Sequence, residues 1–190
     1  ALAAIGERYV REVGSALNVA DAQPLSTFPE IRATPLEALR DVELAAATLF
    51  AEVGMPEVAA SDPLPLGFLQ AQQRAGLVWV AADASDVAVG FAAASEIEDA
   101  IYLEEISVHP AHGRRGIGRS LIETLCDWAG VNGYRAVTLL TFQDVPWNAP
   151  FYSRLGFHPV DTALLHPDVR SWVEEDFAAW APLKRVYMRR

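Results

Sequence analysis

The sequence has one cysteine and one lysine among its 190 residues. The lone cysteine, Cys126, cannot form an intramolecular disulfide, and no second cysteine or pair of histidines lies near it to complete a zinc site. No apolar run approaches the roughly 18 to 20 residues that cross a bilayer, and no basic segment followed by an apolar stretch and a cleavage site opens the chain. These absences predict a cytoplasmic protein with no metal and no membrane partner.

Basic residues are also scarce. The chain has 15 Lys and Arg against 25 Asp and Glu, which gives a formal net charge of -10. Nucleic-acid binding depends on clustered basic side chains, so this balance argues against a nucleic-acid partner. The same excess of negative charge would concentrate a cationic ligand around the protein.

The chain does have enough apolar sequence for one substantial core. Its hydrophobic fraction is 52%, and its length is close to that of a single domain. We expect this domain to span residues 31–190. Residues 1–30 have apolar residues at helical spacing and then a turn-rich segment, which predicts an appended helix and linker.

Apolar spacing within residues 31–190 predicts an α/β fold. Strand-like runs occur at residues 30–35, 77–83, 87–97, 100–108, 135–142 and 183–188. Helical stripes occur at residues 36–53, 66–76, 116–130, 148–156 and 166–180. Short polar turns between the second, third and fourth strands favour an antiparallel meander.

The glycine-rich stretch HGRRGIGRSL, at residues 112–121, stands between a predicted strand and a predicted helix. Glycines let the backbone approach an anion closely, and the first N–H groups of the following helix point at it with a partial positive charge. The stretch departs from the loop of nucleotide-hydrolysing proteins because Arg119 replaces the lysine that contacts the outer phosphates. An anion site is therefore predicted. The alternative is that the glycines only shape a strand-to-helix turn.

The longer segment SVHPAHGRRGIGRSLI resembles the acetyl-CoA signature of the GNAT superfamily of N-acetyltransferases. In that signature a strand ending in V-x-P leads to [QR]-x-x-G-x-[GA] and a helix. Val108, Pro110, Gly116 and Gly118 match it, whereas Gly113 stands where the family has Gln or Arg. Downstream, WNAPFYSRLGF resembles the second signature of the family. The resemblance implies a GNAT fold, with a central mixed, mostly antiparallel, splayed sheet flanked by helices.

The resemblance also implies acetyl-CoA as a co-substrate, bound where the sheet splays. Pantetheine would follow the main chain of the strand before the loop, and the pyrophosphate would meet the N–H groups of the loop. Asn148 is expected to contact the co-substrate, to cap the short helix that follows it, or to do both. The implied contacts are Ile106, Ser107, Val108, Gly113, Arg114, Arg115, Gly116, Ile117, Gly118, Arg119, Ser120, Asn148 and Tyr152.

An acid and a base follow from the same resemblance. In similar enzymes the tyrosine four residues before the G-F pair lies near the CoA sulfur, which indicates Tyr152 as the acid that protonates the thiolate; the alternative is a core aromatic. Glu105 is the preferred base and Glu104 the second candidate, with water or ordinary surface charge as alternatives. Successive strand residues face opposite ways, so at most one of the two carboxyls reaches the site unless a bulge intervenes.

The sequence thus predicts an enzyme that moves the acetyl group of acetyl-CoA to a primary amine by direct attack in a ternary complex. The alternative is a non-catalytic GNAT module that binds or senses acyl-CoA. The acceptor would be a small-molecule or peptide amine, and the chain could form a homodimer. A cationic acceptor is expected if acidic segments of the chain border its site. The acidic residues of these segments are Glu96, Glu98, Asp99, Glu104, Glu105 and Asp144.

Overall fold

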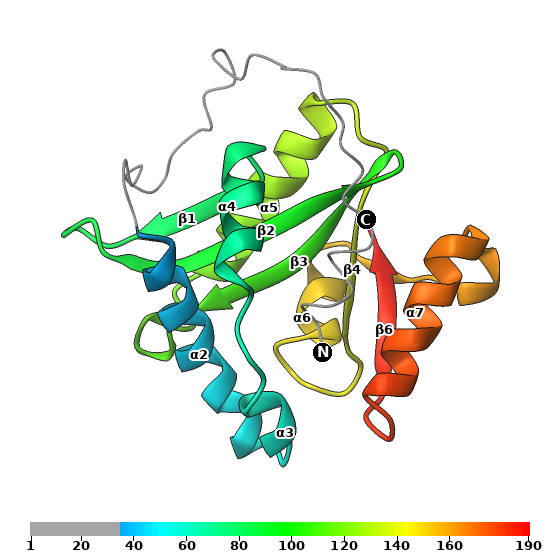
Figure 1. Cartoon of the computed structure of the whole chain (residues 1–190), viewed down its shortest axis with the longest axis horizontal. Helices are drawn as coiled ribbons and strands as arrows, with labels where there is room; N and C mark the ends of the chain where they lie inside the picture. The colour runs from blue at the N-terminus through cyan, green and yellow to red at the C-terminus, as the bar shows by residue number, and fades with distance from the viewer. Residues whose placement is uncertain (1–34) are drawn as a thin grey trace.

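The computed structural model describes residues 35–190, which form a six-stranded sheet with helices on both faces (Figure 1). The first elements are α2 (Leu36–Glu52), α3 (Pro56–Ala59), α4 (Leu66–Arg74), β1 (Val78–Ala82), β2 (Ala88–Ile97) and β3 (Ala100–Val108). They are followed by η1 (Pro110–His112), α5 (Ile117–Val131), β4 (Ala136–Phe142), α6 (Ala149–Arg154), β5 (His158–Pro159), η2 (Thr162–Leu164), α7 (Pro167–Ala179) and β6 (Arg185–Arg189). In this part of the chain, no helix combines the length and the apolar character needed to cross a membrane.

The strands are ordered β1-β2-β3-β4-β6-β5 across the sheet. Neighbouring strands are antiparallel except for β3 and β4, which run parallel. The expected meander is therefore present as β1 to β3. The sheet as a whole is mixed and mostly antiparallel, as the sequence predicts.

β3 and β4 separate partway along their length. They pair only as far as Leu103 and Leu139. Beyond these residues β3 continues to Val108 and β4 to Phe142, and each stays paired with its other neighbour, β2 or β6. In Figure 1, α6 lies between the diverging ends. The predicted splay is confirmed, and it opens at the carboxyl ends of both strands.

α5 covers one face of the sheet, where Leu125 packs in a buried cluster with Leu103. Gly90 of β2 makes this approach close. A Cβ at position 90 would lie 3.1 Å from the carbonyl oxygen of Ser107 and 3.2 Å from Cγ2 of Ile117. A side chain there would push the start of α5 away from the sheet, so this glycine keeps the loop before α5 against the end of β3.

α2 and α7 cover the opposite face. Leu39 of α2 packs with Phe91 of β2, and Val173 of α7 packs with Tyr102 of β3. Tyr102 directly precedes Leu103, whose side chain belongs to the α5 core, and neighbouring strand residues point to opposite faces. Figure 1 shows the same layers, with α2 and α4 in front of β1 and β2 and α5 behind them.

A buried ion pair joins α7 to β6. Arg185 donates from Nε to Oδ1 of Asp176 at 2.8 Å and from Nη2 to Oδ2 at 3.2 Å. The two side chains are 7% and 2% exposed, and the guanidinium carbon lies 4.6 Å from the ring centroid of Phe142. Two parallel hydrogen bonds compensate the loss of hydration, whereas either partner alone would be an uncompensated buried charge. Arg185 is thereby held in one position at the end of β4.

The predicted helices and strands within the described residues are present, with ends displaced by one or two residues. α3 and β5 were not predicted, because 4 and 2 residues are too short to show a periodic pattern. The helix and linker predicted for residues 1–30 lie outside the described residues, as does all but the last residue of the strand predicted at 30–35. The domain boundary after residue 30 stays a prediction.

Candidate active site

The loop between β3 and α5 presents backbone N–H groups at the end of the splay. Gly116 is the N-cap of α5 and has φ 84°, a left-handed conformation that glycine adopts without strain. The N–H of Ser120 donates to the carbonyl of Gly116 at 3.0 Å. The N–H groups before Ser120 have no acceptor within the helix and lie at the positive end of its dipole. This end of α5 is suited to an anion.

Gly118 lies where α5, β3 and α6 meet. A Cβ at this position would lie 3.8 Å from Cγ2 of Val108, at the end of β3, and 3.7 Å from Cζ of Phe151 on α6. These are ordinary contact distances, so a methyl group fits, and a larger side chain would fill the space between the three elements. The structure thus brings together the loop, the strand end and the short helix that were predicted to hold the co-substrate.

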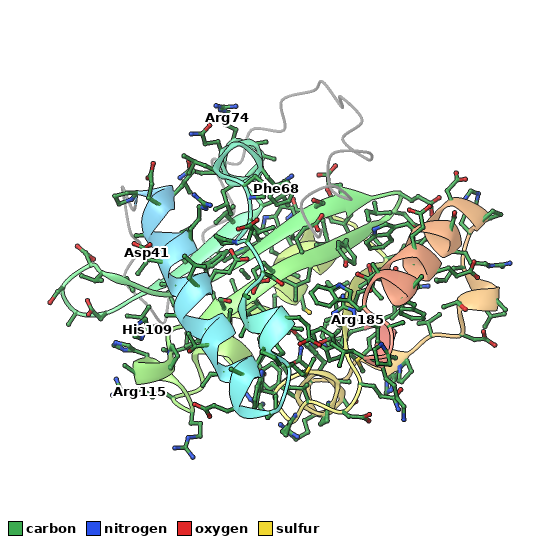
Figure 2. All side chains as sticks on the ribbon, turned by 60° about the horizontal axis from the view of Figure 1, so that its bottom comes forward. Asp41, Phe68, Arg74, His109, Arg115 and Arg185 are labelled. Carbon is green, nitrogen blue, oxygen red and sulfur yellow. The ribbon has the colours of Figure 1, made fainter. Side chains whose placement is uncertain are left out.

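The three arginines of the loop are exposed. Arg114 has a positive φ of 59°, and Arg119 lies 3.4 Å from Glu123 one helical turn later. Figure 2 shows Arg115 extending from the loop on the same side of the molecule as His109. Arg119 therefore shares its charge with a helix neighbour, and Arg114 and Arg115 are the cations that precede the N-terminus of α5.

β3 contains a bulge at Glu104. Ala94 pairs with Leu103 and Ala93 pairs with Glu105, which leaves Glu104 without a partner on β2. Leu103 faces the α5 core, so Glu104 faces the opposite side. Glu105 pairs with Ala93, which belongs to the α2 core, and therefore also lies on the face opposite α5. The bulge places both candidate carboxyls on one face of the sheet.

The pKa values of both carboxyls are raised. Burial raises the pKa of Glu104 to about 7, and the negative charge of Glu105 adds to the rise. Burial also raises the pKa of Glu105, against the hydrogen bond that Ser107 Oγ donates to its Oε1 at 2.8 Å. A carboxyl whose pKa is close to 7 can take up and release a proton at neutral pH, as a general base must.

Tyr152 of α6 is 6% exposed, with ring centroids 5.4 Å from that of Phe151 and 5.7 Å from that of Phe157. Burial raises the pKa of its phenol; the negative charge of Glu105 adds to the rise, and the positive charge of Arg185 opposes it. The phenol therefore keeps its proton at neutral pH. The ring belongs to the core, as the alternative interpretation expects, and the role of the hydroxyl as an acid stays a prediction.

Asn148 stands at the N-cap of α6, but its side chain makes no capping hydrogen bond, so the predicted side-chain cap is wrong. Its Nδ2 donates to Oγ1 of Thr141 on β4 at 2.7 Å. Within the described residues its Oδ1 is buried without a hydrogen-bond partner. The Thr141 contact therefore fixes the side chain against β4 and leaves a buried acceptor oxygen at the start of α6.

Two charged residues beside the carboxyl pair were not found from the sequence. Glu43 of α2 accepts hydrogen bonds from the N–H of Leu64 with both carboxylate oxygens, each at 3.1 Å. Burial raises its pKa to about 9, and the negative charge of Glu105 adds to the rise. Arg185 of β6 acts on Glu105 in the opposite sense and lowers its pKa. No motif marks either residue, because only the fold brings α2 and β6 to β3.

The acidic border predicted for the acceptor site is partly wrong. Glu96, Glu98 and Asp99 surround the β2–β3 turn, at the end of β3 away from the splay. Asp99 lies 3.3 Å from Arg135, and Glu98 pairs with a histidine of the α7 N-terminus at 3.7 Å. The carboxyl groups near the splay are instead those of the β3 pair and of Glu43 on α2. Across residues 35–190, no three His, Cys, Asp or Glu side chains are placed to share a metal ion.

A mixed sheet that splays beside a helix N-terminus, with a carboxyl pair at the opening, defines the acetyltransferase class that the motifs indicate. Residues 40–157 match the model of the Acetyltransferase (GNAT) family. This match covers more than half of the chain, and the protein belongs to the GNAT family of acetyltransferases. The resemblance inferred from the two signatures is confirmed, and so is acetyl-CoA as the co-substrate of this family.

Solved structures show the same fold. The ribosomal-protein-S18-alanine N-acetyltransferase from Escherichia coli aligns with a TM-score of 0.57 and 19% identity, over 81% of this chain and 85% of that chain. A GNAT acetyltransferase from Staphylococcus aureus Mu50 aligns with a TM-score of 0.57 and 13% identity, over 83% of this chain and 94% of that chain. Rv2747 from Mycobacterium tuberculosis, solved in complex with CoA, aligns with a TM-score of 0.55 and 20% identity, over 67% of this chain and 81% of that chain. The predicted GNAT fold is confirmed.

Proposed function

We propose that this protein transfers the acetyl group of acetyl-CoA to a primary amine by direct attack in a ternary complex. One observation carries the proposal: the end of the β3–β4 pairing, the N-terminus of α5 and the bulged carboxyl pair occur at the same place in the fold. An acyl-CoA needs an extended backbone edge and an anion site, and an amine nucleophile needs a base. All three requirements are met there by residues of this chain.

The co-substrate is proposed to lie along β3 and against the start of α5. Its pyrophosphate would accept hydrogen bonds from the N–H groups of residues 115–119, with Arg114 and Arg115 adding positive charge. Its pantetheine would follow the main chain of residues 106–108, beyond the point where β4 leaves β3. The buried Oδ1 of Asn148 offers an acceptor to an amide N–H of the co-substrate.

The proposed reaction moves three protons. The amine arrives as an ammonium ion and loses one proton to Glu105, or to Glu104 beside it, before its nitrogen attacks the thioester carbonyl. A C–N bond forms, and the nitrogen loses its second proton to water. The C–S bond then breaks, and sulfur leaves with the electron pair as a thiolate. Tyr152 donates its phenolic proton to that thiolate and later regains one from solvent.

Cys126 supports direct attack over an acetyl-cysteine intermediate. It lies in the middle of α5, beyond the loop, and burial raises the pKa of its thiol. The thiolate is the nucleophilic form of cysteine, and a raised pKa disfavours it at neutral pH. In the proposed mechanism the acetyl group therefore passes directly from acetyl-CoA to the amine, with no acetyl-cysteine intermediate.

Glu104→Gln and Glu105→Gln identify the base. In the unmodified protein kcat should rise with pH and then level off, because the base must lose its own proton first. This rise on the acidic side of the profile, its acidic limb, should pass through about 7 if Glu104 is the base, and it should lie above the ordinary carboxyl range if Glu105 is. Replacing the true base should lower kcat at least about tenfold and remove this acidic limb, since water replaces a lost base only in part. The measurement is kcat between pH 5.5 and 9, with Glu123→Gln on the exposed side of α5 as the control. An acidic limb that survives in both variants would show that water takes the proton.

The acceptor is proposed to be a cationic amine. The net charge of -10 creates a field that attracts cations and that salt screens over about 8 to 10 Å. An ammonium ion beside the β3 carboxyl pair would also favour the ionised form of these carboxyls. Glycinamide and glycine are a matched pair of primary amines, because only glycine carries a carboxylate. We expect glycinamide to have the higher kcat/KM and to lose that advantage as salt rises. A preference for glycine, or no response to salt, would contradict electrostatic selection.

Two measurements test the function as a whole. Acetyl-CoA should raise the thermal stability of the protein, since a ligand that binds only the folded state stabilises it. Release of free thiol from acetyl-CoA should then be followed with spermidine, glycinamide and an alanine-starting peptide as acceptors. Stabilisation with no thiol release from any amine would favour the non-catalytic acyl-CoA-binding module. Absence of stabilisation would overturn the proposed site.

A further inference from the structure

Arg185 differs from the loop arginines in being buried and rigid. The arginines of residues 114–119 are exposed, whereas the side chain of Arg185 is 7% exposed and bonded at two points to Asp176. Its guanidinium also lies over the ring of Phe142. Figure 2 shows Arg185 beside α7, away from the loop that carries Arg115. A charge fixed at a site with little water acts strongly on its neighbours.

The position of Arg185 follows from the splay. Arg185 pairs with Phe142, the last residue of β4. It therefore stands at the open end of one arm, β4 with β6, while Glu105 stands on the other arm, β3 with β2. The cation and the carboxyl thus belong to the two arms that separate at the splay.

The charges that act on Glu105 come from several elements. Glu104 lies beside it on β3 and Glu43 approaches from α2, and the negative charge of Glu105 raises the pKa of each of these carboxyls. Arg185 from β6 lowers the pKa of Glu105, and it also lowers the pKa of Tyr152 on α6. The base, Glu105, must be a carboxylate before it takes the proton of the amine, and the acid, Tyr152, becomes a phenolate after it gives up its proton. Both forms are anions, so a nearby positive charge favours both.

We propose that Arg185 is a positioning residue for acetyl transfer, which acts through Glu105 and Tyr152: its fixed positive charge favours the ionised form of Glu105, which receives the proton of the amine, and it stabilises the phenolate that Tyr152 becomes. Asp176 and Phe142 hold this charge in place. The inference rests on the proposed function, in which these two residues move the protons. It adds the C-terminal helix and strand to the parts of the chain that determine the rate.

Three substitutions separate charge from packing. Arg185→Lys keeps the positive charge, and Arg185→Gln removes it but leaves Asp176 as a lone buried charge that could unfold the protein. The double variant Arg185→Met with Asp176→Leu replaces the pair by apolar side chains of similar size, which buried ion pairs commonly tolerate. The double variant therefore keeps the test decisive if Arg185→Gln does not fold.

The first readout does not require activity. In protein labelled with carbon-13 glutamate, the carboxyl signal of Glu105 is assigned by its loss in Glu105→Gln and followed as pH changes. Its midpoint should move upward by about half a pH unit or more in Arg185→Gln and by less in the double variant, which also removes the negative charge of Asp176. It should stay close to the original value in Arg185→Lys. A midpoint that does not move when the charge is removed would overturn the inference, even if the protein proves to have no transferase activity.

The second readout is the pH profile of kcat, measured with the amine from the test panel that gives the highest turnover. In the variants without the charge, the acidic limb should move upward by the same amount and kcat on the plateau should fall about tenfold, while acetyl-CoA affinity changes by less than about twofold. Arg185→Lys should restore the limb. If kcat falls but the acidic limb of the pH profile stays at the same pH, Arg185 contributes packing alone. The same conclusion follows if Arg185→Lys and the double variant have equal pH profiles.

Discussion

Tyr152→Phe should lower kcat for acetyl transfer by about 10² or more and leave acetyl-CoA binding almost unchanged. The substitution keeps the ring, which packs between Phe151 and Phe157 in the core, and removes only the hydroxyl. Without it the thiolate leaves unprotonated, so the loss appears in the chemical step rather than in binding. The measurement is thiol release at saturating acetyl-CoA and amine, together with the thermal stabilisation by acetyl-CoA.

Tyr134→Phe is the matched control for this substitution. Tyr134 also carries a phenol whose pKa is raised, but its hydroxyl donates to Glu96 near the β2–β3 turn, at the end of β3 away from the splay. We expect this variant to keep its turnover. If Tyr152→Phe turns over acetyl-CoA at a rate close to that of the unmodified protein, Tyr152 contributes packing and another group protonates the thiolate.

Gly118→Val should abolish the stabilisation by acetyl-CoA while the protein stays folded. At acetyl-CoA concentrations about 100 times the Kd, the lost stabilisation is about 2.7 kcal/mol. The Cβ itself meets Val108 and Phe151 at ordinary distances, so the helix can accept it. The two methyl groups of valine would occupy the space at the start of α5 where the pyrophosphate is proposed to sit. Differential scanning fluorimetry with and without acetyl-CoA measures the effect.

Gly130→Val controls for placing a branched residue in the same helix. Gly130 lies near the end of α5, and a Cβ there would have no neighbour within 4 Å. This variant should keep or slightly gain stability, because valine is a better helix former than glycine, and it should bind acetyl-CoA normally. If acetyl-CoA stabilises Gly118→Val and Gly130→Val equally, the start of α5 is not part of the co-substrate site.

Local patterns in the sequence predicted most of the elements and the anion site. Period-two runs and short polar turns located β1 to β3, and a continuous apolar stripe located α5. Gly116 is recognisable because a strand-to-helix turn of this kind needs a left-handed residue, which the sequence supplies as glycine. These features depend on residues close together in the chain, which is why a single sequence can show them.

The face on which a charged side chain lies was harder to predict. The bulge at Glu104 is a property of the register between β2 and β3, and nothing in the letters AIYLEEISV indicates where an extra residue interrupts the pairing. Glu43 resembles any polar residue of an amphipathic helix, and Arg185 any polar residue of a strand. Their influence on Glu105 depends on contacts between elements far apart in the sequence.

Asn148 shows a different limit. An asparagine directly before a helix with a proline in its first turn is a common capping pattern, and the position was predicted correctly. The side chain turns instead to Thr141, which lies seven residues earlier on β4. The capping preference is worth only about 1 kcal/mol, so one hydrogen bond from the neighbouring strand can replace it.

The strand order has a consequence for how the chain is made. Of the six strands of the sheet, β6 is the last to emerge during synthesis, yet it lies between β4 and β5. Until it arrives, the nascent protein exposes an unpaired edge of β4 from Thr138 to Phe142, and such edges readily pair with other chains. The amino-terminal part, with the meander and α5, can acquire its core earlier. The half of the splayed sheet that carries Arg185 can form only when synthesis has passed residue 189. A chain that stops short of β6 would therefore have the glycine loop, but it would lack both the complete six-stranded sheet and the fixed cation of Arg185.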